Sequence, residues 1–214
     1  MHEPTRVFAL RHGQTAWNAE RRIQGQLDVP LDDTGRWQAA RLAQALAEEG
    51  LAAIYSSDLQ RAHATALALA AATGLEVGTQ VALRERFFGH FEGTTFAEIE
   101  QRWPEDVLRW RRREAGFGPG GGEPLAAFYA RSVAAVTQLA ARHPGQAIAV
   151  VAHGGVLDGL YRAAMHLALD APRTWQIDNA SINRLLYTGE GWAVTGWNDS
   201  SHLAGAAGAG SEEA

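Results

Sequence analysis

Two histidines and two arginines stand in contexts typical of a catalytic anion site. Arg11 and His12 precede a glycine near the N-terminus, His153 precedes two glycines, and Arg61 follows a Ser-Ser-Asp run. A guanidinium is permanently charged and can pair with two phosphate oxygens at once. A neutral imidazole can attack phosphorus and carry the phosphoryl group. The set predicts phosphoryl transfer, a reaction that depends mostly on positioning and on neutralising the charge of the transferred group.

A proton donor for the leaving group is the second requirement of this chemistry. Glu85 is the candidate, provided that the pocket keeps its carboxyl group protonated before transfer. Each of these residues also has an ordinary interpretation, because a histidine beside glycine can be structural and Arg61 can be a cation on a helix surface. Residue types alone leave both interpretations open.

The elements that would position these residues alternate between strands and helices. Apolar runs predict strands over 6–10, 52–55, part of 76–83, 146–152, 182–187 and 192–197. Helices are predicted over about 35–48, 59–73, 123–142 and 156–168, with Thr34 capping the first and residues 56–58 capping the second. This alternation predicts an α/β fold with a mainly parallel sheet.

Two segments depart from the alternation. Residues 84–122 are irregular, rich in Phe and Trp, and end in a Gly-Pro-Gly-Gly-Gly run. They predict loops and short helices that form a cap over a site. Residues 204–214 are low in complexity and are predicted to be disordered.

The candidate residues follow predicted strands, at the edge of a sheet where α/β proteins bind ligands. Arg11 and His12 come after the first strand, Arg61 soon after the second, and His153 directly after the strand over 146–152. Neighbouring strands would bring all four into one pocket. A helix that begins near His153 would aim its backbone N–H groups and its dipole at the same anion.

Five blocks resemble, in order and in spacing, the motifs of the histidine phosphatase superfamily, the phosphoglycerate mutase-like proteins. Residues 11–18 (RHGQTAWN) resemble R-H-G-[EQ]-T-x-x-N, and residues 56–66 resemble S-S-D-L-x-R-A-x-x-T-A. Residues 25–35 resemble G-x-x-D-x-P-L-x-x-x-G, and residues 83–93 resemble L-x-E-x-x-F-G-x-[WF]-E-G. The last block, residues 151–155, resembles the closing strand and H-G-G. One such tripeptide is weak evidence, whereas five blocks in register are very specific.

The resemblance implies a role for each matching residue. His12 would be the nucleophile that becomes phosphohistidine. Arg11, Arg61 and His153 would hold the phosphoryl oxygens. Glu85 would donate a proton to the leaving group and then act as the base for water.

Three more residues would bind substrate. The resemblance places Asn18 and the backbone N–H of Gly154 near the phosphoryl group, and Gln24 where relatives often contact phosphate or substrate. It also implies a three-layer α/β/α sandwich in one domain over 1–203, with a cap inserted at about 86–122. Neither a metal nor an organic cofactor is implied, and monomer and homodimer both stay open.

A phosphatase and a cofactor-dependent phosphoglycerate mutase would share the phosphohistidine. The family's mutases carry a Tyr soon after the acidic Glu, then a Gly-Leu-Asn-Lys segment whose Lys holds the substrate acid. Here Arg86 and two phenylalanines follow Glu85. The chain contains no lysine, so all 19 residues in its Lys+Arg total are arginine. The resemblance is therefore to the phosphatase branch, which acts on small phosphorylated metabolites. A phosphate-binding module without turnover is a further alternative, although such proteins usually lose the nucleophile or the acid.

Composition excludes several other classes. The absence of Lys excludes a Walker-type phosphate loop and a Schiff-base lysine, and the absence of Cys excludes thiolate catalysis, disulfides and Cys-ligated metals. A net charge of −5 argues against general nucleic-acid binding. No apolar run approaches the roughly 20 residues of a membrane span. With no signal-peptide pattern at the start, a cytoplasmic protein is expected.

Two features of the predicted cap have no assigned role. Arg111, Arg112 and Arg113 form either a solvated helix face or a cluster that binds a substrate carboxylate or second phosphate. His90 lies near the predicted rim of the pocket. The physiological substrate is not encoded in any motif, because the cap is the least regular segment.

Overall fold

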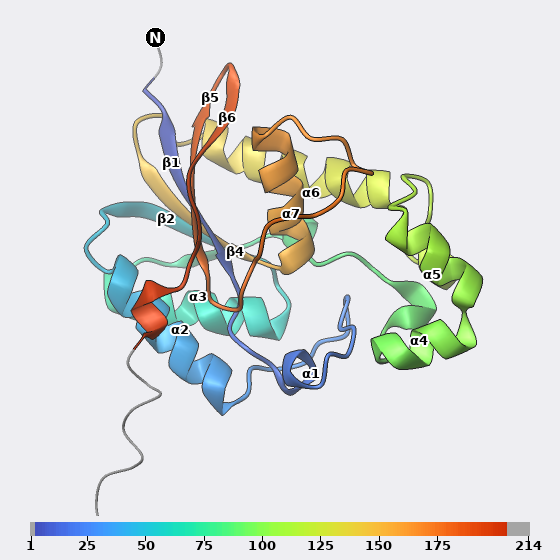
Figure 1. The fold of residues 1–214 in the computed structure, drawn as a ribbon. Helices are drawn as coiled ribbons and strands as arrows, with labels where there is room; N and C mark the ends of the chain where they lie inside the picture. Colours follow the sequence, from blue (N-terminus) through green and yellow to red (C-terminus); the bar gives the residue numbers. More distant parts are fainter. Residues whose placement is uncertain (1–2, 205–214) are drawn as a thin grey trace, which may run out of the picture.

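A computed structural model describes residues 3–204. The strands form one six-stranded sheet in the order β3-β2-β4-β1-β5-β6 (Figure 1). Their bounds are β1 Thr5–Arg11, β2 Leu51–Ser56, β3 Val77–Thr79, β4 Ala147–Ala152, β5 Ile182–Thr188 and β6 Gly191–Asp199. Neighbours from β3 to β1 are parallel, whereas β5 is antiparallel to β1 and β6 to β5.

Helices cover both faces of the sheet. Their bounds are α1 Ala16–Ala19, α2 Asp33–Leu46, α3 Gln60–Thr73, α4 Phe96–Arg102, α5 Pro104–Arg111, α6 Leu125–Ala141 and α7 Gly154–Ala164. Helices α2 and α3 pack on one face, and α6 and α7 pack on the other (Figure 1). The predicted α/β fold in three layers with a mainly parallel sheet is confirmed.

A hydrophobic core lies on each face of the sheet, and β1 and β4 contribute to both because successive side chains point to opposite faces. Val7 and Ala9 face the core that includes Leu157 of α7, whereas Phe8 faces the core that includes Leu42 of α2. All six residues of β4 are buried, as expected for a central strand covered on both faces. The parallel strands β2, β4 and β1 are neighbours, so their carboxyl ends meet at one edge.

Two predicted helix caps are wrong. The N-cap of α2 is Asp32 rather than Thr34, and its side chain accepts a hydrogen bond from the Gly35 N–H. Helix α3 has no cap from residues 56–58; instead Asp28, from a distant loop, accepts a 2.7 Å hydrogen bond from the Gln60 N–H. A sequence pattern can predict only caps from neighbouring residues, whereas the bond from Gln60 to Asp28 joins residues far apart in the chain.

Helix α7 begins earlier and ends earlier than the predicted range 156–168. It begins at Gly154, and His153 is its N-cap. It ends at Ala164 because the chain turns back, with His166 in the left-handed region at φ 53° and the Leu167 N–H bonded to the carbonyl of Arg162. The predicted strands and the other long helices lie within a few residues of their expected ranges.

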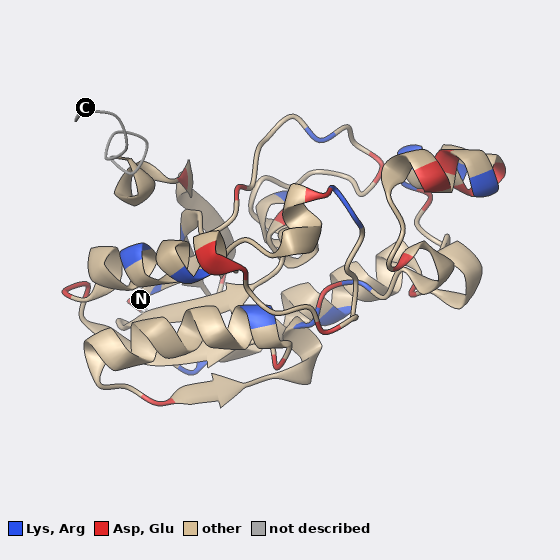
Figure 2. Cartoon of the chain, turned by 90° about the horizontal axis from the view of Figure 1, so that it is seen from below, with Lys and Arg blue, Asp and Glu red and all other residues tan. Residues whose placement is uncertain are grey.

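Residues 86–122 contain the short helices α4 and α5 and two 3₁₀ turns, Gly89–Phe91 and Pro119–Gly121. They lie beyond one end of the sheet, and acidic and basic residues are interspersed along α4 and α5 (Figures 1 and 2). A separate small core joins Phe91, Ile99 and Val107 of this segment to Ile23, which lies between α1 and α2. The predicted disorder over 204–214 concerns residues that, apart from Ala204, lie outside the described range.

Candidate active site

The predicted residues gather where β1, β2 and β4 end. The His12 N–H donates to the carbonyl of Ala152 at 3.1 Å, so the chain beyond β1 lies against the end of β4. A cavity of about 340 Å³ opens at this edge. Of the predicted site residues, those that line it are Arg11, His12, Asn18, Gln24, Arg61, Glu85 and Gly154.

The remaining predicted residue, His153, lies against His12. Their ring centroids are 5.2 Å apart with the planes inclined by 58°. Both rings are buried, and burial, followed by the charge of Arg61, holds the pKa of each imidazole well below 6.5. Both histidines are therefore neutral at pH 7.

The tautomer of His12 follows from the one hydrogen bond that its ring makes with residues 3–204. Nδ1 lies 2.7 Å from the carbonyl oxygen of Gly13, which can only accept, so the neutral ring carries its proton on Nδ1. The lone pair is then on Nε2. A neutral imidazole with a free Nε2 beside two arginines has the electronic state that a nucleophile toward phosphorus requires.

The two arginines are anchored through backbone carbonyls rather than carboxylates. Arg11 donates from Nη1 to Ile177 at 2.6 Å, and Arg61 donates from Nη1 to Leu27 and from Nη2 to Gly25. Burial lowers the pKa of each guanidinium to about 10, so both stay charged at pH 7. Each Nε is buried without a hydrogen-bond partner among residues 3–204. An anion in the cavity would accept from these donors and remove the cost of leaving them unpaired.

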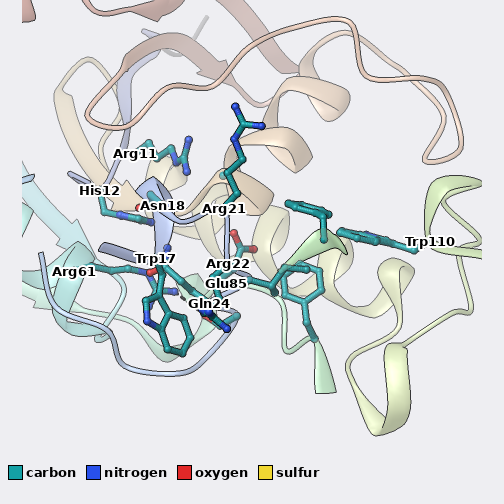
Figure 3. A pocket seen from close by; sticks show the side chains of 15 residues that line it. Arg11, His12, Trp17, Asn18, Arg21, Arg22, Gln24, Arg61, Glu85 and Trp110 are labelled. Carbon is teal, nitrogen blue, oxygen red and sulfur yellow. Dashed lines mark hydrogen bonds between the residues drawn. The ribbon is translucent and has the colours of Figure 1, made fainter. Parts of the chain in front are cut away.

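Glu85 is held by two backbone N–H groups from different parts of the chain. Arg86 donates to Oε1 at 2.8 Å, and Gly155, in the first turn of α7, donates to Oε2 at 2.9 Å. Figure 3 shows Glu85 between Arg11, His12 and Arg61 on one side of the cavity and Trp110 on the other. The carboxyl group therefore lies between the cationic end and the part of the cavity that would receive a leaving group.

The three residues expected to bind substrate are also placed at the cavity. Asn18 Oδ1 accepts hydrogen bonds from Thr15 and from Asn179. Gln24 is buried, and its Oε1 has no partner within the described chain. Gly154 is the first residue of α7, where backbone N–H groups lack partners inside the helix and the dipole favours an anion.

Several residues at the site were not predicted. The Nδ2 of Asn179 donates to the carbonyls of His12 and Gly13, and so fixes the loop that carries the imidazole. The sequence offers no signal for this, because Asn179 precedes β5 and belongs to none of the five blocks. The cavity is completed by side chains that the motifs do not mark, namely Trp17, Arg21, Arg22, Ile23, Phe96 and Trp110, and by Phe88, which belongs to the block over 83–93.

Aromatic side chains form one wall of the cavity. Trp17, next to the Arg-His-Gly loop, lines it. Phe88 and Trp110 pack against the small core of the cap and also line the cavity. Phe96 stacks on Trp110 at 5.4 Å and continues the same apolar wall.

The three consecutive arginines point to different surroundings. Arg111 pairs with Glu100 on the exposed side of α4, and Arg112 is exposed. Arg113 donates to Asp158 of α7 at 2.8 Å. Neither of the two alternatives for the cluster therefore describes all three residues.

His90 does not line the cavity. Its ring stacks on Trp103 at 4.0 Å, and its Nε2 lies 3.2 Å from a carboxylate oxygen of Asp106. These contacts tie the 3₁₀ turn of the cap to α5.

Residues 3–204 contain neither a cluster of metal ligands nor a membrane-spanning helix. No group of three or more metal-ligating side chains is gathered in this part of the chain. None of its helices is long and apolar enough to span a membrane.

A family model described as histidine phosphatase superfamily (branch 1) matches residues 7–200. The chain belongs to this superfamily. The resemblance drawn from the five sequence blocks is therefore confirmed, and the match extends through β5 and β6, well beyond those blocks.

Known relatives of this histidine phosphatase are similar over most of their length. Phosphoglycerate mutase-like protein 4 of Arabidopsis thaliana is 42% identical over 201 residues, which cover 92% of this chain and 86% of that protein. The metal-independent phosphoserine phosphatase of the same plant is 36% identical over 204 residues, covering 94% and 84%. The structure of a mycobacterial glucosyl-3-phosphoglycerate phosphatase with VO3 aligns with a TM-score of 0.83 at 36% identity, over 91% of this chain and 99% of that one.

Proposed function

We propose that the protein is a phosphatase that hydrolyses a small phosphorylated metabolite through a phosphohistidine on His12. The predicted activity class, a phosphoric monoester hydrolase of the histidine phosphatase superfamily, is confirmed by the family match and by relatives named as phosphatases. The roles of the individual residues are our proposal. The observation that carries it is the neutral His12, with Nε2 free, between two charged arginines.

In the first half of the reaction, His12 Nε2 attacks phosphorus while the ester P–O bond breaks. Arg11 and Arg61 hold the equatorial oxygens and neutralise their charge, with His153 and the Gly154 N–H at the same end of the cavity. Glu85 gives its proton to the departing alkoxide, because an alkoxide is a poor leaving group without one. The products of this step are the free alcohol and phosphohistidine.

In the second half, water replaces the alcohol. The Glu85 carboxylate takes a proton from the water as its oxygen attacks phosphorus, and the N–P bond breaks to release phosphate. His12 and the Glu85 carboxyl group return to their starting states. Asn18 and Gln24 hold the transferred group or the substrate during both steps, and no step uses a metal or an organic cofactor.

A phosphoglycerate mutase is the second candidate, because some relatives are named phosphoglycerate mutase-like protein or probable phosphoglycerate mutase. A mutase would return the phosphoryl group to a substrate hydroxyl instead of water. The chain has no Lys with which to hold the acid of phosphoglycerate in the manner of the family's mutases. We therefore favour hydrolysis.

The test is phosphate release from p-nitrophenyl phosphate and from a panel of phosphorylated metabolites, with a mutase assay in parallel. We expect release of phosphate that persists in EDTA. Activity that EDTA abolishes and added metal restores would contradict the metal-independent mechanism. Isomerisation of phosphoglycerate faster than its hydrolysis would favour the mutase.

Three predictions from the sequence accompany this proposal. One catalytic domain over 1–203, with residues 86–122 as its cap, predicts a single cooperative unfolding transition in calorimetry. Cell fractionation tests the predicted cytoplasmic location. Light scattering distinguishes a monomer from a homodimer, both of which the sequence leaves open.

A further inference from the structure

A second cavity, of about 290 Å³, adjoins the first. The two share a wall made of Arg11, Glu85, Phe88, Trp110 and Gly154. A ligand that places its phosphoryl group beside Arg11 can therefore extend past Glu85 into the second cavity. Leu125, Phe128 and Ile177 make part of this second cavity apolar.

The charged lining of the second cavity is mostly cationic. Arg86, Arg113 and Arg173 line it in addition to the shared Arg11, whereas its carboxylates are Glu85 and Asp158. Arg86 is anchored on the backbone carbonyls of Glu123 and Phe117 rather than on a carboxylate. Its positive charge therefore has no hydrogen-bonded carboxylate to offset it.

Asp158 organises the arginines on the far side. Its Oδ2 accepts hydrogen bonds from Arg113 at 2.8 Å and from Arg162 at 3.0 Å, and its Oδ1 lies 3.9 Å from Nε of Arg173. Three guanidinium groups around one carboxylate leave an excess of positive charge. Arg113 is fixed further by a 2.5 Å hydrogen bond from Nε to the carbonyl of Leu169.

Arg173 is the member of this group that can accept a ligand. Its side chain is 40% exposed and donates one hydrogen bond, from Nε to the carbonyl of Trp175. Both Nη groups have no partner among residues 3–204. It also lies near the reaction site, because Arg173 lines the same cavity as Arg11 and Glu85.

We propose that Arg173, supported by Arg113, binds a carboxylate on the leaving group of the substrate. The substrate class would be a phosphomonoester of a carboxylic acid, and Asp158 would be a positioning residue that orients the arginines. A planar, singly charged carboxylate fits the paired N–H donors of one guanidinium. The apolar part of the cavity would solvate that charge poorly, so the pairing with Arg173 decides specificity. This inference rests on the proposed phosphatase function.

The test compares 3-phosphoglycerate with glycerol 3-phosphate, which has a hydroxymethyl group in place of the carboxylate. Each is measured as a competitor of p-nitrophenyl phosphate turnover. We expect the wild-type protein to bind 3-phosphoglycerate at least about tenfold more tightly, as for one charge-assisted hydrogen-bonded pair. Arg173→Gln should remove this preference by weakening 3-phosphoglycerate alone, and Arg173→Lys should restore part of it.

Arg112→Gln is the matched control, because it removes one positive charge next to Arg113 from an exposed residue that lines neither cavity. It should leave the preference unchanged. Equal binding of the two esters by the wild-type protein, or equal weakening of both in Arg173→Gln, would overturn the proposal. If the wild-type protein does not turn over p-nitrophenyl phosphate, the proposed function fails; the carboxylate site is then tested with the same two esters by titration calorimetry.

Discussion

The Gly155 N–H donates a 2.9 Å hydrogen bond to Oε2 of Glu85, and a Cβ atom on Gly155 would stand 2.2 Å from Oε1 of the same carboxylate. The second glycine of the His-Gly-Gly block therefore both holds the carboxylate and leaves room for it. The added Cβ would also stand 3.0 Å from two ring carbons of Phe128. Gly154 is less constrained, since its nearest contact, Nε of Arg11, would lie at 3.8 Å.

Gly155→Ala should displace the Glu85 carboxylate and slow the hydrolysis of alkyl phosphates by about 10- to 100-fold, because general acid catalysis depends on placement. Overpacking of the site should also cost about 1–3 kcal/mol of stability. Steady-state kinetics and urea unfolding measure the two effects. Gly159→Ala, in the same helix, is the control, since its Cβ would meet its nearest neighbour at 3.4 Å. Equal behaviour of the two variants would contradict this account of Gly155.

Glu85→Gln should lose most activity toward esters whose alkoxides are poor leaving groups. A glutamine cannot donate the acidic proton, so we expect a loss of about 100-fold or more for alkyl phosphates. For p-nitrophenyl phosphate the loss should be under about tenfold, because nitrophenolate leaves without help. Measuring kcat for both esters in one preparation provides an internal control. A loss of equal size for both esters would refute the acid role.

The free energy of unfolding should fall as the pH drops below about 6.5. His12 and His153 have folded-state pKa values well below 6.5, mainly through burial and then through the charge of Arg61. In that window the unfolded chain binds protons that the folded protein does not. The two histidines therefore contribute their full stability above pH 6.5 and lose it as the pH falls, by more than about 1 kcal/mol per pH unit for each.

Urea unfolding between pH 7.5 and 5 measures this slope. The double variant His12→Asn, His153→Asn should have a shallower dependence than the wild-type protein. His166→Asn changes an exposed histidine in the left-handed region, a conformation that Asn tolerates, and should keep the wild-type slope. A double variant with an unchanged slope would mean that the two buried imidazoles do not control acid stability.

Much of the site could be predicted because its residues directly follow strands that are readable from apolar runs. Once β2, β4 and β1 are neighbours, the positions of His12, Arg61 and His153 follow from the geometry of a parallel sheet. Glu85 follows no long strand, so sheet geometry did not place it. It was a candidate acid by residue type, and the family resemblance supplied its role at the site.

The unpredicted features are contacts between segments far apart in the chain. Asp58 was expected to help cap α3, and it pairs with Arg84 instead, whose hydrogen bonds lower the pKa of the carboxyl group. The hydrogen bond from Asn179 to the carbonyl of His12 joins residues that are more than half the chain apart in sequence. No periodicity encodes such pairs, because each depends on how loops pack once the sheet has formed.

The most direct test of the central claim is to trap the phosphoenzyme and locate the phosphate. Protein quenched in base during turnover of a phosphomonoester and then analysed by mass spectrometry should carry one phosphoryl group on His12. The modification should be acid-labile and base-stable, and absent from His12→Ala, whose turnover should fall at least about 1,000-fold. Phosphate trapped on another residue, or turnover undiminished in His12→Ala, would contradict the mechanism.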